Sequence, residues 1–121
     1  MSDKSTYKLH AGICKALAHP IRIEIIDVLQ NNELTFGEIC EATGCLKSNL
    51  SQHLSSMTSK GILQYRKEKQ KVYYKLSSKK VATACRIMRE VLIENLEKQR
   101  ELFQTLKPSM NITSPSKSKN L

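Results

Sequence analysis

Apolar residues recur every three or four positions along the first part of this 121-residue chain, which is the spacing of a buried helix face. One predicted helix covers residues 7 to 18, with four apolar side chains on its inner side: Leu9, Ile13, Ala16 and Leu17. A second helix begins at Pro20, because a proline in the first turn loses no needed hydrogen bond. Asn31 and Asn32 end this helix, whose buried residues are Ile21, Ile25, Ile26, Val28 and Leu29.

Two short helices joined by a tight turn follow in the chain. Thr35 and Glu38, three residues apart, form a capping box that starts the first of them. Gly44 ends it, because glycine accepts the positive φ of the residue after the last turn without a steric cost. The second helix carries a buried stripe of Leu50, Leu54 and Met57. This pattern predicts a helix-turn-helix, whose second helix can enter the major groove of DNA.

Gly61 stops the second of these helices, and after it the apolar spacing becomes that of strands. Residues 62–66 and 72–76 predict a two-stranded wing, and the lack of glycine in its tip, residues 68–71, predicts a long tip. Ser77 or Ser78 caps a last helix that runs to about residue 106 and carries the apolar stripe Val81, Cys85, Met88, Leu92, Leu96, Phe103 and Leu106. One small domain cannot cover this stripe, so we expect a homodimer formed through the first and last helices.

These elements predict a mainly α-helical fold with a two-stranded β wing, a winged helix-turn-helix of five helices. We expect one DNA-binding and dimerisation domain over residues 7–106. Residues 1–6 are expected to form a flexible N-terminus, and residues 107–121 a disordered basic tail in which Pro, Ser, Asn and Lys dominate.

The positive charge of the chain is concentrated in the same region as the helix-turn-helix and the wing. Residues 46–80 hold nine basic residues and one acid, a net of +8 within a total of +9. The rest of the chain holds 11 basic and 10 acidic residues. A solvated basic face is the other interpretation of such a run, but its position on a helix-turn-helix favours binding to nucleic acid.

Other classes of protein are disfavoured. The polar N-terminus has no apolar core of a signal peptide, and no apolar run approaches the ~20 residues that cross a bilayer, so we expect a cytoplasmic protein without membrane contact. Four cysteines without tight spacing do not form a disulfide scaffold there. There is no Cys-x-x-Cys, no Gly-rich phosphate loop and no His motif oriented by a carboxylate, so we predict no enzyme activity.

Three segments, in this order, carry a family resemblance: residues 15–29 (KALAHPIRIEIIDVL), the helix-turn-helix with residues 51–54 (SQHL), and the wing strand at residues 72–76 (VYYKL). Over about residues 7–106 the chain resembles the ArsR/SmtB family of small bacterial and archaeal winged-helix repressors. The resemblance implies a homodimer that binds an inverted-repeat operator in double-stranded DNA and leaves it when an inducer binds.

The candidate DNA contacts fall into two groups. Polar side chains at the start of the recognition helix are predicted to read bases or meet the adjacent phosphate: Lys47, Ser48, Asn49, Ser51 and Gln52. Basic side chains of the wing are predicted to contact the flanking backbone or minor groove: Arg66, Lys67, Lys69 and Lys71. For His53 two interpretations stay open, a phosphate contact or packing behind the helix with one ring nitrogen hydrogen-bonded.

The sensing site is less defined. The two metal sites familiar from the family are not expected, because residues 33–38 (ELTFGE) lack cysteine and the last helix lacks histidine. No cofactor is required, and metal binding is left undecided. The candidate sensing thiols are Cys14, which lies one helical turn after His10, and Cys85. Cys40 and Cys45 are the rival pair, expected to face different directions, and ordinary core packing is the alternative for all four.

The sequence therefore predicts a homodimeric transcriptional repressor that an inducer releases from its operator. A soft metal ion, a thiol oxidant or a persulfide is the candidate inducer. The alternative function is a winged helix that binds nucleic acid without an inducer, as an architectural or RNA-binding module does.

Overall fold

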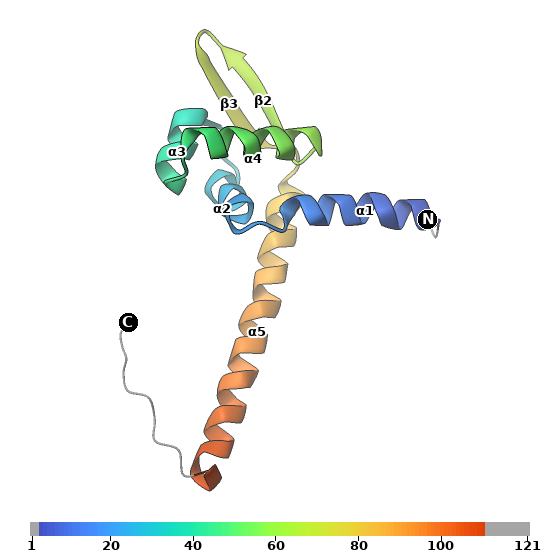
Figure 1. Cartoon of the computed structure of the whole chain (residues 1–121), viewed down its shortest axis with the longest axis vertical. Coiled ribbons are helices and arrows are strands. Elements are labelled where there is room, and N and C mark those ends of the chain that lie inside the picture. Colours follow the sequence, from blue (N-terminus) through green and yellow to red (C-terminus); the bar gives the residue numbers. More distant parts are fainter. Residues whose placement is uncertain (1–2, 111–121) are drawn as a thin grey trace. The chain divides into compact units, whose positions relative to one another are not determined.

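The computed structural model describes residues 3–110 and confirms the mainly helical winged helix-turn-helix (Figure 1). Its elements in chain order are α1 (Lys4–Leu17), α2 (Pro20–Leu29), β1 (Leu34–Thr35), α3 (Phe36–Thr43), α4 (Lys47–Ser59), β2 (Leu63–Glu68), β3 (Lys71–Leu76) and α5 (Lys79–Met110). The chain divides into two compact units, Met1–Cys85 and Arg86–Leu121. Helix α5 begins in the first unit and supplies the described part of the second.

Local sequence signals set the helix-turn-helix. The Thr35 hydroxyl accepts from the Glu38 backbone N–H at 3.1 Å, and the Glu38 carboxylate accepts from the Thr35 N–H at 2.8 Å, so the predicted capping box is confirmed. Gly44 then adopts φ +70° and ends α3. Helix α4 ends in a Schellman motif, in which Gly61 has φ +77° and the Ile62 N–H donates to the Met57 carbonyl. These caps confirm the helix ends predicted at both glycines.

The first unit has one hydrophobic core, to which α1–α4 and the sheet all contribute. Helices α2 and α4 supply three buried residues each, and α3 adds Ile39, which is fully buried. The first residues of α5 pack against its edge. The buried residues are Ala16, Ile25, Ile26, Leu29, Ile39, Leu50, Leu54, Met57, Ile62, Leu63 and Leu76, and the partly buried ones from α5 are Val81, Ala82 and Cys85.

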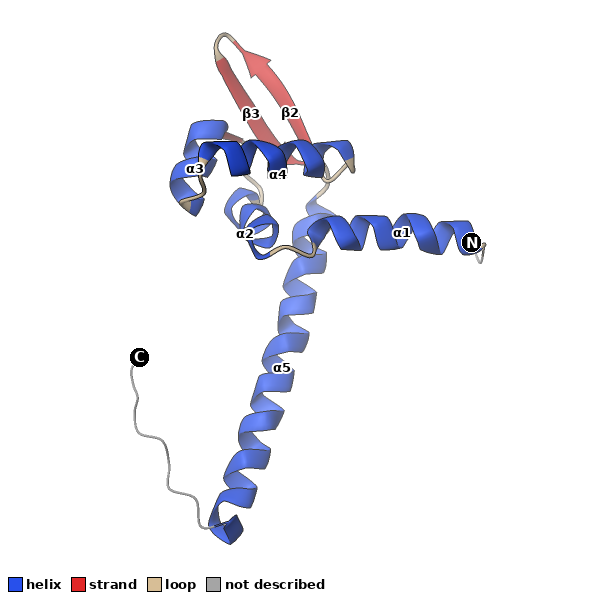
Figure 2. Cartoon of the chain, viewed as in Figure 1, coloured by secondary structure: helices blue, strands red, loops and turns tan. Residues whose placement is uncertain are grey.

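The wing is part of a three-stranded antiparallel sheet of order β1–β3–β2, where the sequence predicted two strands (Figure 2). The short strand β1 pairs with β3 through Leu34 opposite Tyr74. The predicted long tip is wrong, because only Lys69 and Gln70 separate β2 from β3. Lys69 makes this tight turn possible by adopting φ +59°, the conformation that usually favours glycine at the first central position of a two-residue hairpin.

The outer ends of the first and last helices differ from the prediction. Helix α1 begins at Lys4, so residues 4–6 are helical rather than part of a flexible N-terminus. Asp3 is the reason, because its carboxylate accepts from the Ser5 N–H at 3.0 Å and caps the helix. Helix α5 continues to Met110, so residues 107–110 are helical rather than part of the predicted tail. The rest of that tail, residues 111–121, lies outside the described residues.

Candidate DNA interface

Helix α4 separates an apolar inner side from a polar outer side. Its stripe of Leu50, Leu54 and Met57 is fully buried in the core. On the outer side, Ser48, Asn49, Ser51 and Gln52 are exposed, as a recognition helix requires. They line a shallow hollow together with three serines that the sequence prediction missed, Ser55, Ser56 and Ser59. Continuing the helical repeat from Ser48 and Gln52 would have found these serines, because residues three and four apart share a helix face.

The start of α4 carries charge but no side-chain cap. Lys47 is the first helical residue and is exposed, as predicted for a phosphate contact. Leu46 occupies the N-cap position with extended backbone angles (φ −63°, ψ 143°), makes no capping hydrogen bond and is 69% exposed. The first backbone N–H groups of the recognition helix therefore have no side-chain acceptor from this residue.

Leu46→Ser should raise the free energy of unfolding by about 0.5–1 kcal/mol, because serine at a position with these backbone angles supplies the missing acceptor. Urea unfolding monitored by circular dichroism would measure the change. Leu46→Ala is the matched control, because it removes the same exposed leucine without adding an acceptor. Equal stability of the serine and alanine variants would contradict the capping argument.

His53 lies on the inner side of the helix-turn-helix, in an arrangement that fits the packing interpretation. Its Nδ1 accepts a hydrogen bond of 2.9 Å from Arg22 Nε, and its ring lies 6.0 Å from the ring of His19. Arg22 also donates to the Ala16 carbonyl at 2.9 Å. Burial, followed by the nearby Arg22 and His19 charges, lowers the pKa of His53 below its ordinary value. His53 therefore connects α4 to α2 and, through Arg22, to the end of α1.

Arg66 is held by two carboxylates, Glu68 on its own strand and Glu33 next to β1, although the sequence prediction grouped it with the DNA contacts. Its guanidinium makes two hydrogen bonds of 2.9 Å to Glu33 and one to Glu68, and lies 4.3 Å from the centre of the Tyr73 ring. These carboxylates raise the pKa of Arg66, and Arg66 lowers that of Glu33. A guanidinium bonded in this way supports the wing, and contact with phosphate would require it to exchange partners.

The three lysines of the wing that are predicted to contact DNA are exposed. Lys67 lies on β2, Lys69 in the turn and Lys71 at the start of β3. The hairpin projects beyond α4 (Figure 1). Three lysines on a projecting hairpin are suited to the backbone that flanks a major-groove site.

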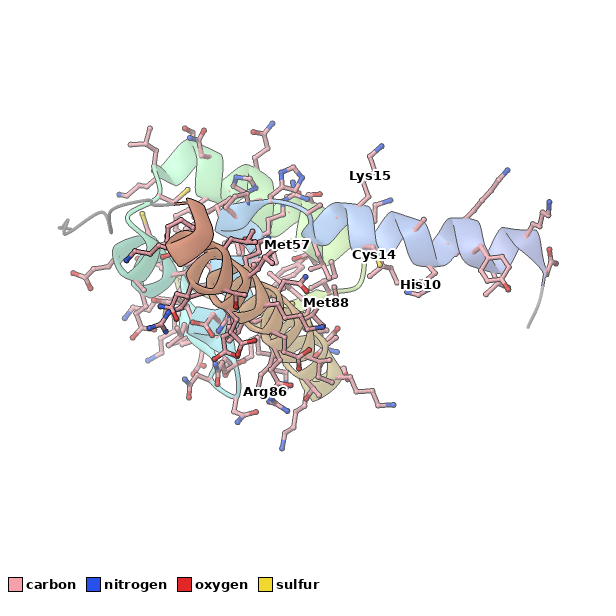
Figure 3. All side chains as sticks on the ribbon, turned by 90° about the horizontal axis from the view of Figure 1, so that it is seen from below. His10, Cys14, Lys15, Met57, Arg86 and Met88 are labelled. Atoms are coloured by element: carbon pink, nitrogen blue, oxygen red, sulfur yellow. The ribbon has the colours of Figure 1, made fainter. Side chains whose placement is uncertain are left out.

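The four cysteines occupy different environments. Cys14 is exposed on α1, and Figure 3 shows it on the same side of the helix as His10, with Lys15 on the other side. Cys85 is half-buried against the core. The Cys40 thiol donates to the Cys45 carbonyl at 3.0 Å, so these two residues meet within the turn of the helix-turn-helix. The Cys40 side chain thus points toward the Cys45 backbone.

Two kinds of feature are absent from residues 3–110. Within this range, no three or more His, Cys, Asp or Glu side chains are grouped so that they could hold a metal ion. The same range contains no helix with the length and apolar content of a membrane span.

The fold and the exposed polar face of α4 define a winged helix-turn-helix DNA-binding protein. Residues 19–65 match the family described as bacterial regulatory protein, arsR family. The chain belongs to this family, because it is also 30% identical to a possible ArsR-family regulator of which it covers 93%. It is a transcriptional regulator and not an enzyme, and the family resemblance seen in the sequence is confirmed.

Three relatives illustrate the similarity. The HTH-type transcriptional regulator Rv0081 of Mycobacterium tuberculosis is 29% identical over 114 residues, 93% of this chain and 100% of the relative. Its crystal structure superposes with a TM-score of 0.71 at 32% identity, covering 78% and 95% of the two chains. The homodimeric winged helix-turn-helix domain of Mb0332 from Mycobacterium bovis gives 0.71 at 30% identity, covering 81% and 93%. Reduced HlyU from Vibrio cholerae gives 0.66 at 32% identity, covering 73% and 93%.

Proposed function

We propose that this protein is a homodimeric, sequence-specific repressor that binds an inverted-repeat operator and is released by an inducer. The polar outer face of α4, presented opposite a fully buried stripe, carries the proposal. The exposed lysines of the wing supply sequence-independent attraction to the backbone. The Mb0332 domain is homodimeric, which supports a dimer of this protein with two recognition helices. We expect these helices to bind two operator half-sites whose centres lie about 34 Å apart or a multiple of that distance.

Footprinting on DNA upstream of candidate genes tests this function. A repressor of this kind protects one short inverted repeat at nanomolar concentration, and transcription from that promoter falls in vitro. The alternative, a winged helix without an operator, coats DNA broadly with little preference between sequences. If the inverted repeat is protected but transcription increases, sequence-specific binding is supported and repression is contradicted. This outcome matters because the HlyU relative is named a transcriptional activator.

Gln52→Ala or Asn49→Ala should weaken operator binding by about 1–3 kcal/mol and leave binding to random DNA nearly unchanged, because these side chains are predicted to contact bases. Lys69→Ala should weaken both kinds of binding equally, because a phosphate contact carries no sequence information. It should also reduce the dependence of log K on log salt by about 0.9 per subunit. Fluorescence anisotropy across a salt series measures both effects. If Lys69→Ala alone lost the preference for operator over random DNA, the assignment of base contacts to α4 and phosphate contacts to the wing would be reversed.

We also propose that a thiol reaction triggers release from the operator, with Cys14 and Cys85 as the responsive residues. The exposure of Cys14 and its position one turn from His10 favour its reactivity. One of the similar structures is that of reduced HlyU, and a redox state specified for a relative supports a redox-dependent trigger here. A free-energy difference of about 1–3 kcal/mol between two arrangements of the dimer is enough for a useful switch.

Operator release by peroxide, persulfide or a soft metal ion should be lost in Cys14→Ser and in Cys85→Ser and retained in Cys40→Ser and Cys45→Ser. The serine variants keep the size of the side chain and remove the thiol. Electrophoretic mobility shifts before and after treatment, with recovery by dithiothreitol, measure the response. If only Cys40→Ser and Cys45→Ser lost the response, the responsive thiols would be those in the turn of the helix-turn-helix. A response unchanged in all four variants would make the cysteines packing residues.

A further inference from the structure

The outer face of α4 has no positive charge from its second residue to its last. Residues 48–59 contain no lysine or arginine, and the hollow on this face is lined by five serines, Asn49 and Gln52. The basic residues Lys47 and Lys60 stand at the two ends of the helix and do not line the hollow. The central part of the recognition surface therefore presents only short hydroxyl and amide groups to the bases.

The arginines of the first unit do not compensate for this lack. Arg22 donates to His53 Nδ1 and to the Ala16 carbonyl, on the inner side of α4. Arg66 is bonded to Glu33 and Glu68 and lies over Tyr73. No other arginine occurs in Met1–Cys85. Within this unit, either guanidinium would have to leave these partners to make the commonest specific contact to guanine, the pair of hydrogen bonds to its O6 and N7.

The amides that are present fit adenine. A carboxamide can donate to N7 and accept from the N6 amino group of adenine at the same time, whereas both major-groove groups of guanine are acceptors. Serine hydroxyls contact any base, so they do not favour guanine.

We propose that the base pairs that face Asn49 and Gln52 in each operator half-site are A·T, with adenine contacted by the amide in the major groove. This inference rests on the proposed function and specifies the DNA class that the site recognises. Lys47 is left for phosphate or for a base pair at the end of the half-site, where a G·C pair remains compatible with the proposal.

Selection of binding sites from a random duplex library by the full-length protein, followed by sequencing, tests the base class. We expect an inverted repeat with A·T at the central positions of each half-site. Replacing the contacted adenine by 7-deazaadenine removes the N7 acceptor and should weaken binding by wild type about 5- to 150-fold. The same replacement should have little effect on DNA binding by the variant that lacks the amide facing that adenine, either Gln52→Ala or Asn49→Ala.

Gln52→Arg supplies a gain-of-function test. It should change the selected base at one position of each half-site from adenine to guanine, because it introduces the missing guanidinium. Gln64→Arg is the matched control, since it makes the same substitution at an exposed position of β2 and should strengthen binding without changing the selected sequence.

The outcomes separate the inference from the function on which it rests. The A·T assignment would be overturned if the selected inverted repeat had central G·C pairs that stayed the same in the Gln52 and Asn49 variants. The proposal of a sequence-specific regulator would then still stand. Failure to select any sequence would overturn both, because a protein without an operator has no half-site to assign.

Discussion

Leu96→Glu and Leu92→Glu should each make the protein monomeric at micromolar concentration and weaken its binding to a two-half-site operator by about a hundredfold or more. Both leucines lie on the stripe of α5 that the sequence assigns to the dimer, and they are 53% and 54% exposed in the single chain. Exposed apolar side chains in such a row mark a surface that a partner covers. A monomer loses the gain in effective concentration that links the two half-sites.

The monomeric variants should remain folded, which makes this test specific. Every buried core residue comes from positions 16 to 76, and none comes from the second unit. Analytical ultracentrifugation would give the oligomeric state, and circular dichroism the helix content. Thr105→Glu is the matched control, because it adds the same charge nine residues from Leu96, about half a turn away around the helix. A Leu96→Glu protein that sediments as a dimer would contradict the assignment of α5 to the interface.

The first helix leads to the same expectation from a different part of the chain. The sequence placed Leu9 and Ile13 on the inner side of α1, but they are 74% and 45% exposed, and only Ala16 of this face is buried. The apolar periodicity was correctly recognised, yet periodicity alone does not distinguish a face covered by the same chain from a face covered by another. In this protein the residues that a single chain leaves exposed are those that the proposed homodimer would cover.

Local signals were the most predictable part of the fold. The capping box at Thr35 and Glu38 and the glycines at positions 44 and 61 each act within one helical turn, and the structure contains all of them. The wing turn shows the limit of this approach, because Lys69 accepts a positive φ where the sequence rule requires glycine. The pairing of β2 with β3 brings Glu68 opposite Lys71 and leaves two residues for the turn.

Contacts between distant residues could not be predicted from local patterns. Arg66 meets Glu33 across 33 positions of sequence, and Arg22 meets His53 across 31. In the sequence, Arg66 was one member of a basic run and His53 one polar residue of the recognition helix. Only the fold shows that Glu33, next to the short strand β1, lies within 2.9 Å of the arginine. The partners of Arg66 and His53 therefore come from other elements, and the sequence left the packing of His53 as one of two interpretations.

Arg22→Leu should lower the free energy of unfolding by about 1–3 kcal/mol, because it leaves two part-buried acceptors without their donor. These acceptors are His53 Nδ1 on α4 and the Ala16 carbonyl at the end of α1, each 2.9 Å from the guanidinium. Operator affinity should fall together with stability, because the same bonds fix α4 relative to α1 and α2. Urea unfolding and anisotropy titration on one set of samples would measure both. An Arg22→Leu protein of wild-type stability would show that these bonds contribute little.

Protonation of His53 should weaken the same junction, so stability should fall as the pH decreases. Nδ1 accepts from Arg22, and a proton on that nitrogen removes the acceptor and places a second cation beside the guanidinium. The folded pKa of His53 is lowered from its ordinary 6.5, mainly by burial, so the unfolded state takes up the proton first. The contribution of neutral His53 is therefore complete above about pH 6.5 and decreases as the pH falls toward the folded pKa.

Unfolding free energies measured between about pH 8 and pH 5 should show this decrease in wild type. It should be smaller in His53→Asn, which keeps an acceptor without a titrating group. His10→Asn, a change at an exposed histidine of α1, should behave like wild type. A His53→Asn profile parallel to that of wild type would exclude His53 as the source of the pH dependence.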